Sequence, residues 1–267
     1  YIPMKKLAAV FAGLSLLILM PDKLSASVLR SNLIGKWDCK SSTYFDWGTI
    51  YENSVTDIRE DGILDGIDNI DFIYHLAALA RIQPSFEEPE ITFETIVLGT
   101  MNIMSLADRK KCPVIYAGSS SSHGDLFANP YTFSKYQGEE MVKMWNKIYG
   151  VKSAICRFYN VYGPHQLEDG AYATVIGIFE KQFRDGVELT ITGDGEQRRD
   201  FTHVYDIVDG FIKAGEWLID NKGGETFELG RGENYSIIVI AQSFDAGYTY
   251  IPKRPGEVQE TLCTDMK

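Results

Sequence analysis

The chain has 267 residues, of which 45% are hydrophobic and 24% are charged, and its net charge at pH 7 is −11. A chain of this length and composition can bury a full core, as one large or two smaller domains of an ordinary globular protein. The acidic balance argues against nucleic acid or an anionic membrane as the main partner, so an anionic ligand would need a local arginine cluster.

The four cysteines are scattered, with no Cys-x-x-Cys pair and no histidine at the spacing of metal ligands. Such a pattern indicates reduced, structural cysteines and no metal site. They are Cys39, Cys112, Cys156 and Cys263.

The first apolar block, residues 7–20, follows Met4-Lys5-Lys6 and precedes Ser25-Ala26-Ser27. Residues 4–27 thus have the layout of a secretory signal peptide. A first buried strand and helix of an α/β sheet would also be apolar, and the run is short for a membrane span. The block alone leaves both interpretations open.

From residue 68 to residue 158, apolar strands alternate with helical segments. The predicted strands are residues 68–78, 113–117 and 153–158, and the predicted helices are residues 90–109 and 131–149. This alternation is typical of a parallel, doubly wound sheet, in which ligands bind beyond the carboxyl ends of the strands. After residue 163 the segments shorten to a helix at 175–184, an apolar stretch at 188–192 and a helix at 205–218.

Tyr131 and Lys135 stand four residues apart at the start of a predicted helix, just after a serine run at 119–122. Side chains at this spacing lie over one another on one helical face. An ammonium beside a phenol favours the phenolate and lowers the tyrosine pKa from about 10. Tyr131 would then be a general base near neutral pH, with the serine run as a proton relay. For the pair alone, chance spacing in a helix is the alternative.

Several further stretches occur in a known order together with the serine run and the Tyr131-x-x-x-Lys135 pair. They are residues 56–59, 75–78, 97–100, 157–164, 193–204 and 254–257. In this order and at these spacings, the stretches resemble the extended short-chain dehydrogenase/reductase family, especially its NAD-dependent sugar-nucleotide epimerases and dehydratases such as the UDP-glucose 4-epimerase-like enzymes.

The resemblance implies a Rossmann-type α/β fold with a small C-terminal α/β lobe for the substrate. It places a dinucleotide-binding domain with an atypical start at residues 1–162 and the substrate lobe at 163–267. Part of residues 196–235 would return to the Rossmann sheet. It also implies NAD as the cofactor, a nucleotide-diphospho-sugar as the substrate, and a homodimer built on helices 90–109 and 131–149.

The same resemblance assigns roles to individual residues. The catalytic trio would be Ser119, Tyr131 and Lys135. Besides Tyr131 and Lys135, the cofactor would be bound by Asp57 and Ile58 at the adenine, by Leu76, Ala77 and Ala78 along the dinucleotide, and by Phe158 at the nicotinamide. The substrate would be bound by Ser120, Ser121, Asn160, Arg199, Arg254 and Glu257, with the two arginines on the diphosphate because guanidinium groups suit phosphate oxygens. Taken singly, Arg199 could form only a surface ion pair with Asp200 or Asp206, and Phe158 could be plain core packing.

One feature narrows the expected reaction. The related 4,6-dehydratases carry an acidic residue directly after the catalytic serine or threonine, whereas this chain has Ser120 and Ser121. Serine hydroxyls cannot make the extra proton transfers of water elimination. We therefore expect epimerisation of the sugar, by transient oxidation at one carbon, and rank dehydration lower.

The start of the chain departs from the family. In register, the three glycines of the Gly-x-x-Gly-x-x-Gly fingerprint fall on Phe11, Leu14 and Leu17, where side chains would take the place of the cofactor pyrophosphate. Three accounts stay open: weakened NAD binding, a cofactor-free relative that binds a sugar nucleotide or a protein partner without turnover, and a start that is not native. The register match favours a degraded first strand and helix over a signal peptide, so we expect a cytoplasmic protein, with export as the alternative.

Overall fold

In the computed structural model, the described residues are the backbone of 8–11, 16–20, 43–46 and 49–52, together with residues 59, 70 and 72–265. The main sheet has six strands in the order β1-β2-β5-β6-β7-β12. Its strands are β1 (Ala8–Phe11), β2 (Leu16–Met20), β5 (Phe72–His75), β6 (Val114–Ser119), β7 (Ser153–Phe158) and β12 (Thr226–Leu229).

Four neighbouring strands, β5 to β12 in the sheet order, are parallel to one another. Alternate residues of β6 enter different cores, because Val114 and Tyr116 face one helical layer while Ile115 and Ala117 face the other. A strand buried on both faces is expected in a parallel sheet covered by helices. The predicted doubly wound α/β class is thus confirmed for this part of the sheet.

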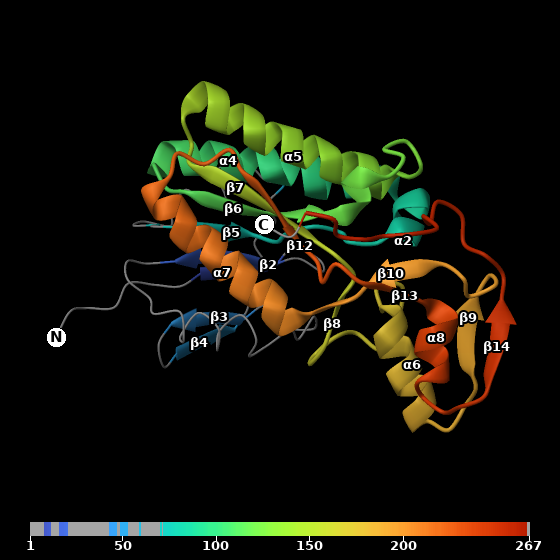
Figure 1. Cartoon of the computed structure of the whole chain (residues 1–267). Helices are drawn as coiled ribbons and strands as arrows, with labels where there is room; N and C mark the ends of the chain where they lie inside the picture. The colour runs from blue at the N-terminus through green and yellow to red at the C-terminus, as the bar shows by residue number, and fades with distance from the viewer. Residues whose placement is uncertain are drawn as a thin grey trace.

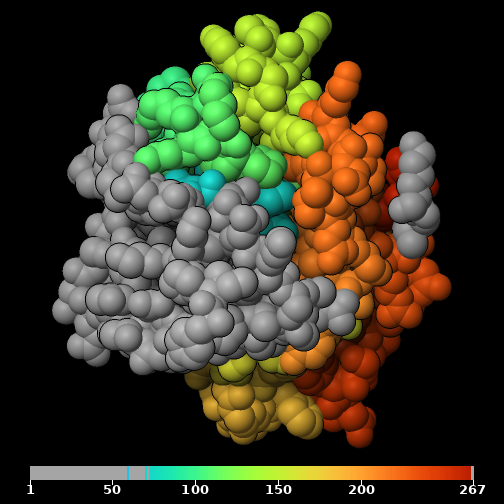
Figure 2. Space-filling view, turned by 90° about the vertical axis from the view of Figure 1, so that its left-hand side faces the viewer, coloured from blue at the N-terminus to red at the C-terminus, as the bar shows by residue number. Residues whose placement is uncertain are grey.

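The helices lie in two layers on the faces of this sheet (Figure 1). One layer holds α4 (Gly99–Lys110) and α5 (Pro130–Tyr149), and the other holds α7 (Val204–Asp220). In Figure 2 the residues around β5, in cyan, show between α4 in green and α7 in orange. The predicted helix at 90–109 is one continuous run of α3 (Pro89–Phe93), a π-helical turn (Glu94–Leu98) and α4.

The start of the chain corrects one expectation. In place of a first strand and helix, β1 and β2 pair antiparallel, and β2 then pairs antiparallel with β5. A further hairpin joins β3 (Thr43–Asp46) and β4 (Thr49–Glu52). A short apolar run suits a strand or a buried helix equally well, so its periodicity could not decide between them.

The smaller lobe lies beside the end of the sheet, with α6, α8 and two short sheets packed together (Figure 1). Its own core includes Phe179, Leu189 and Ile191. The elements of the lobe and of its junction with the sheet are β8 (Val161–Tyr162), α6 (Val175–Arg184), β9 (Leu189–Thr192), β10 (Arg198–Asp200), β11 (Thr202–His203), β13 (Asn234–Ser236), α8 (Ile237–Gln242) and β14 (Tyr248–Ile251).

One buried carboxylate joins three distant segments of the lobe. Asp200, which is fully buried, accepts backbone N–H groups from Arg231 and Gly232 at 2.9 Å and from Cys263 at 3.0 Å. A buried carboxylate is stable only when such donors satisfy it. The side chain of Asp200 therefore fixes the chain path on either side of β10.

Three of the four cysteines lie among the described residues. Cys112, Cys156 and Cys263 are reduced and buried, as predicted, whereas Cys39 lies outside the described residues. Within the described ranges, no helix is long and apolar enough to cross a membrane.

Candidate active site at the carboxyl ends of the strands

A serine turn forms at the carboxyl end of β6. The strand ends at Ser119, and a 3₁₀ turn (Ser120–His123) follows. The Ser119 Oγ accepts the backbone N–H of Ser121 at 3.2 Å and lies 2.9 Å from the Ser121 Oγ. This local capping holds the Ser119 hydroxyl at the end of the strand.

The first turn of α5 brings the tyrosine to this serine. Asn129 caps the helix by accepting the N–H of Thr132 at 2.8 Å, and Pro130 follows at the first helical position, as is favourable for a helix start. The Tyr131 hydroxyl then donates a long hydrogen bond, 3.4 Å, to the Ser119 Oγ.

Lys135 lies one turn further along α5 and is only 3% exposed. Its Nζ donates to the carbonyl oxygen of Ala117 at 2.5 Å and lies 4.3 Å from the centroid of the Tyr116 ring. Burial lowers the pKa of this ammonium to about 8, against an opposing effect of Glu139, because desolvation disfavours the charged form. The structure thus brings together all three residues of the predicted trio.

The expected lowering of the tyrosine pKa by Lys135 is corrected by the structure. Burial raises the pKa of Tyr131, and the opposing influences come from the Ser119 hydrogen bond and the guanidinium of Arg81. The ammonium of Lys135 is bound instead to the Ala117 carbonyl. In this state the cation that favours the phenolate is Arg81, which the sequence analysis did not single out.

A buried carboxylate behind the serine turn was also missed. Glu139, fully buried, accepts the Ser119 N–H at 3.2 Å, the Ser122 hydroxyl at 3.1 Å and Arg157 Nη2 at 2.7 Å. Arg157 also pairs with Glu228 at 3.0 Å. The spacing Tyr131, Lys135, Glu139 repeats every four residues, so the helical face that carries the predicted pair already pointed to this carboxylate.

The predicted cofactor residues fall into two groups. Ala77 and Ala78 are buried just after β5 with Leu76 beside them, and Phe158 packs against Phe211 of α7 with ring centroids 5.4 Å apart. Asp57 and Ile58 lie outside the described residues.

The chemical groups at the end of β6 suit a nicotinamide-ribose. Lys135 supplies a buried amine and Tyr131 a phenol, and Ala77 and Ala78 after β5 have small side chains. At the pyrophosphate end, Phe11 ends β1 and Leu17 lies in β2, opposite His75. Residues 8–11 and 16–20 are therefore strands of a hairpin and form no glycine turn into a helix, while Leu14 lies outside the described part of the chain.

Two of the predicted substrate residues near the strands, Asn160 and Ser121, already form hydrogen bonds within the protein. Asn160 donates both amide hydrogens, to the Asp200 carbonyl at 3.0 Å and to Thr261 Oγ1 at 2.9 Å, which leaves only its own carbonyl oxygen for a ligand. Ser121 bonds to Ser119. Ser120 follows Ser119 at the first position of the 3₁₀ turn and is half-buried.

Two arginines and a glutamate meet in the lobe. Arg199 Nη2 and Arg254 Nη1 each lie 3.9 Å from a carboxylate oxygen of Glu257, which is longer than a hydrogen bond. The partner of Arg199 is thus Glu257 and neither Asp200 nor Asp206. Burial lowers the pKa of Arg199, and Glu257 opposes this. Two loosely paired guanidinium groups suit an anionic ligand such as a diphosphate.

Comparison with known proteins identifies a matching family model and similar curated proteins. Residues 49–230 match the family model described as "NAD dependent epimerase/dehydratase family". A putative UDP-glucose 4-epimerase from Methanocaldococcus jannaschii is 31% identical over 224 residues, which cover 76% of this chain and 72% of that protein.

Solved structures share the fold. An epimerase from Methanothermobacter thermautotrophicus superposes with a TM-score of 0.73 and 27% identity, over 88% of this chain and 80% of that one. A UDP-glucuronic acid 4-epimerase variant from Bacillus cereus, solved with a fluorinated UDP-glucuronic acid and NAD, gives a TM-score of 0.70 and 27% identity over 77% of this chain and 70% of that one.

Proposed function

Since this chain belongs to the NAD-dependent epimerase/dehydratase family, we propose that it epimerises a nucleotide-diphospho-sugar through transient oxidation at one sugar carbon. The observation that carries the proposal is the Tyr131 phenol at 3.4 Å from the Ser119 hydroxyl, with Lys135 buried one turn away. Ser119 ends the parallel strand β6, and Tyr131 and Lys135 reach Ser119 and Ala117 of that strand from α5; ligands bind at the carboxyl ends of strands in such sheets.

Each member of the trio has a distinct task in this scheme. Tyr131 takes the proton of the sugar hydroxyl as the carbon that carries it is oxidised, and Ser119 holds that hydroxyl in place. Lys135 binds the nicotinamide ribose. After the keto sugar has turned its other face, Tyr131 returns the proton to the oxygen as the carbon is reduced. NAD, when bound, supplies the hydride acceptor and donor, so the whole cycle is neutral in electrons and protons.

The distinction between epimerisation and dehydration rests on the serine turn. Relatives include UDP-glucuronic acid decarboxylases as well as epimerases, so membership alone leaves the reaction type open. Elimination of water needs an added acid beside the reacting carbon. The side chains that follow Ser119 are the hydroxyls of Ser120 and Ser121, which supports epimerisation over dehydration.

A second candidate is a relative that binds the sugar nucleotide without turnover. The β1–β2 hairpin favours it, because these strands stand where the fingerprint would hold the cofactor pyrophosphate. In such a protein, Arg199 and Arg254 would still bind the diphosphate, but Ser119, Tyr131 and Lys135 would not catalyse a reaction.

One experiment separates the two candidates. The purified protein with added NAD is incubated with UDP-glucose, and the appearance of UDP-galactose is followed by NMR; other UDP-hexoses and dTDP-hexoses are tested in the same way. Tyr131→Phe is expected to lower kcat by roughly 10²-fold or more, as for loss of a general base. Tyr149→Phe, at an exposed position of the same helix, is the matched control. Saturable binding of UDP without turnover of any sugar would refute epimerisation and favour the second candidate.

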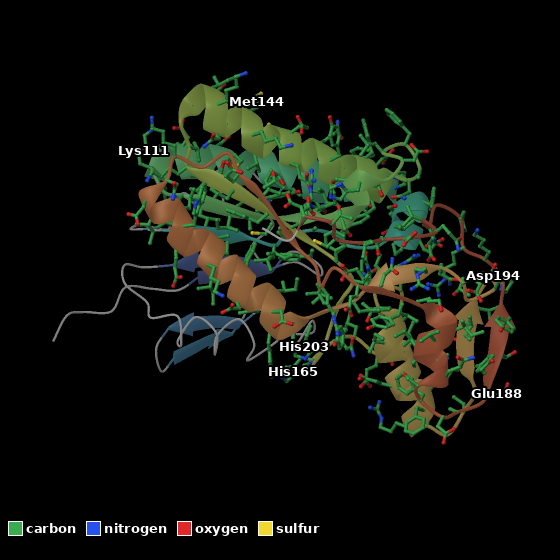
Figure 3. All side chains as sticks on the ribbon, viewed as in Figure 1. Lys111, Met144, His165, Glu188, Asp194 and His203 are labelled. Carbon is green, nitrogen blue, oxygen red and sulfur yellow. The ribbon has the colours of Figure 1, made fainter. Side chains whose placement is uncertain are left out.

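The proposal also includes a homodimer and a cytoplasmic location. We place a homodimer contact on the outer faces of α4 and α5, where Met101, Met144 and Ile148 are exposed; Met144 points away from the body of the protein in Figure 3. A family that depends on NAD supports a cytoplasmic location. The interpretation of residues 4–27 as a signal peptide concerns mostly residues outside the described ranges.

A further inference from the structure

Arg81 stands at the carboxyl edge of the sheet, a few residues after β5. It precedes the short helix α2 (Ile82–Glu87) in an extended conformation. Its Nε donates to the Tyr172 carbonyl at 2.8 Å, and its Nη1 donates to the Ala80 carbonyl at 3.0 Å. The guanidinium is therefore held in a defined position between the sheet edge and the loop that leads into α6.

The bonding of this guanidinium is incomplete. Of its five N–H groups, two are used by these carbonyls, and no carboxylate among the described residues pairs with it. Burial lowers the pKa of Arg81, and Arg254 lowers it further. A cation that burial disfavours and that lacks an anion gains from a ligand that supplies one.

The surroundings place this cation at the reacting end of the site. The Tyr131 N–H donates to Ser85 of α2 at 3.2 Å, and Gln83 of α2 donates to the Pro255 carbonyl at 2.8 Å. Hence α2, the first turn of α5 and the segment that carries Arg254 form one corner, visible where α2 approaches the end of α5 (Figure 1). Arg81 and Tyr131 are close enough for each to shift the pKa of the other.

Two other arginines are assigned to the diphosphate. Arg199 and Arg254 lie on either side of Glu257 in the lobe, whereas Arg81 belongs to the loop after β5 and lies close enough to both Tyr131 and Arg254 to be affected by their charges. A neutral sugar would leave the free N–H groups of Arg81 without an anion. A carboxylate on the sugar could accept two of them in the bidentate arrangement that guanidinium groups favour.

From this arrangement we propose that Arg81 binds a carboxylate carried by the sugar, so that the substrate class is an acidic nucleotide-diphospho-sugar such as a UDP-uronic acid. The inference rests on the proposed function for the identity of the ligand, but it concerns binding and does not require turnover.

Calorimetry with NAD present tests it, using UDP, UDP-glucose and UDP-glucuronic acid as three probes. The unaltered protein is expected to bind UDP-glucuronic acid at least about tenfold more tightly than UDP-glucose, in line with a charge-assisted bidentate pair. Arg81→Gln should remove this preference and leave the affinity for UDP unchanged, while Arg81→Lys should keep part of it. Arg184→Gln, at an ion pair on the lobe surface, is the matched control and should change none of the three affinities.

Several results would overturn the inference. They are equal binding of the two sugars by the unaltered protein, a preference that survives Arg81→Gln, or an equal loss of UDP affinity in that variant, which would assign Arg81 to the diphosphate. Absence of UDP binding would overturn both this inference and the proposed function. If the protein prefers UDP-glucuronic acid through Arg81 but turns over no sugar, this inference is upheld and epimerisation is refuted. If it turns over UDP-glucose but shows no preference for UDP-glucuronic acid, epimerisation is upheld and this inference is refuted.

Discussion

Replacing Lys135 by methionine is expected to stabilise the folded protein while abolishing the epimerase activity proposed above. The ammonium is 3% exposed, and its pKa falls from the ordinary 10.5 to about 8. At about 1.4 kcal/mol for each pKa unit, holding this charge in the folded state costs about 3 kcal/mol at pH 7. Methionine has a similar length and no charge, but it gives up the bond to the Ala117 carbonyl, worth about 1 kcal/mol. The expected net gain is about 2 kcal/mol.

The gain should depend on pH in a defined direction. The folded pKa of Lys135 lies below its unfolded value, so between pH 8 and 10.5 the unfolded chain binds more protons and the native protein gains stability as the pH rises. The cost of the charge is complete below pH 8 and is gone above 10.5. At pH 9 about 2 kcal/mol of it remains, so the advantage of Lys135→Met should shrink to about 1 kcal/mol.

Urea unfolding of both proteins at pH 7 and pH 9 measures this difference. Lys147→Met, at an exposed position of the same helix, is the control and should show no comparable gain and no such dependence. A variant at position 135 that is less stable than the parent at pH 7, or whose advantage is the same at both pH values, would show that burial of the ammonium does not carry the assigned cost.

Two further substitutions test the packing behind the site. Glu139→Gln should destabilise the fold by about 3 kcal/mol, because the charge of Arg157 loses one of its carboxylate partners. The control is Glu140→Gln at the exposed neighbouring position, which should change stability by less than about 0.5 kcal/mol. Similar losses of stability at both positions would contradict this reasoning. Gly138→Ala should destabilise by about 1–3 kcal/mol despite better helix propensity, because its Cβ would lie 2.3 Å from the hydroxyl oxygen of the buried Tyr116 ring. Thermal unfolding measures the loss, and adding Tyr116→Phe should restore part of it; if it restores nothing, the clash is not the cause.

Local sequence signals predicted several elements well. The strand at 153–158 and the helix at 175–184 have the predicted bounds, and α5 begins one residue earlier than predicted. These segments carry their own boundary signals, such as the Asn129-Pro130 entry to α5 and Gly150 in the left-handed conformation directly after it. The convergence of Ser119, Tyr131 and Lys135 was expected from the family resemblance and from the four-residue spacing of Tyr131 and Lys135 on one helical face.

Local sequence signals could not predict how distant segments of the chain are arranged in space. No local pattern distinguishes a hairpin at β1 and β2 from a strand followed by a helix. The binding of Lys135 to the Ala117 carbonyl depends on how α5 sits on β6, and helical spacing alone cannot show it. Arg81 was overlooked for the same reason, because a single basic residue gains meaning only when its neighbours in space are known.

The convergence of two distant segments on the carboxylate of Asp200 has a consequence for synthesis on the ribosome. The proposed catalytic trio and the strands behind it are complete once the chain has been made to about Phe158, apart from the later addition of β12. The carboxylate of Asp200, next to Arg199, finds its last backbone donor only when Cys263 has emerged, 63 residues later. Because contacts of long sequence separation form late, a nascent chain is expected to bring the proposed catalytic residues together before it completes the proposed diphosphate site.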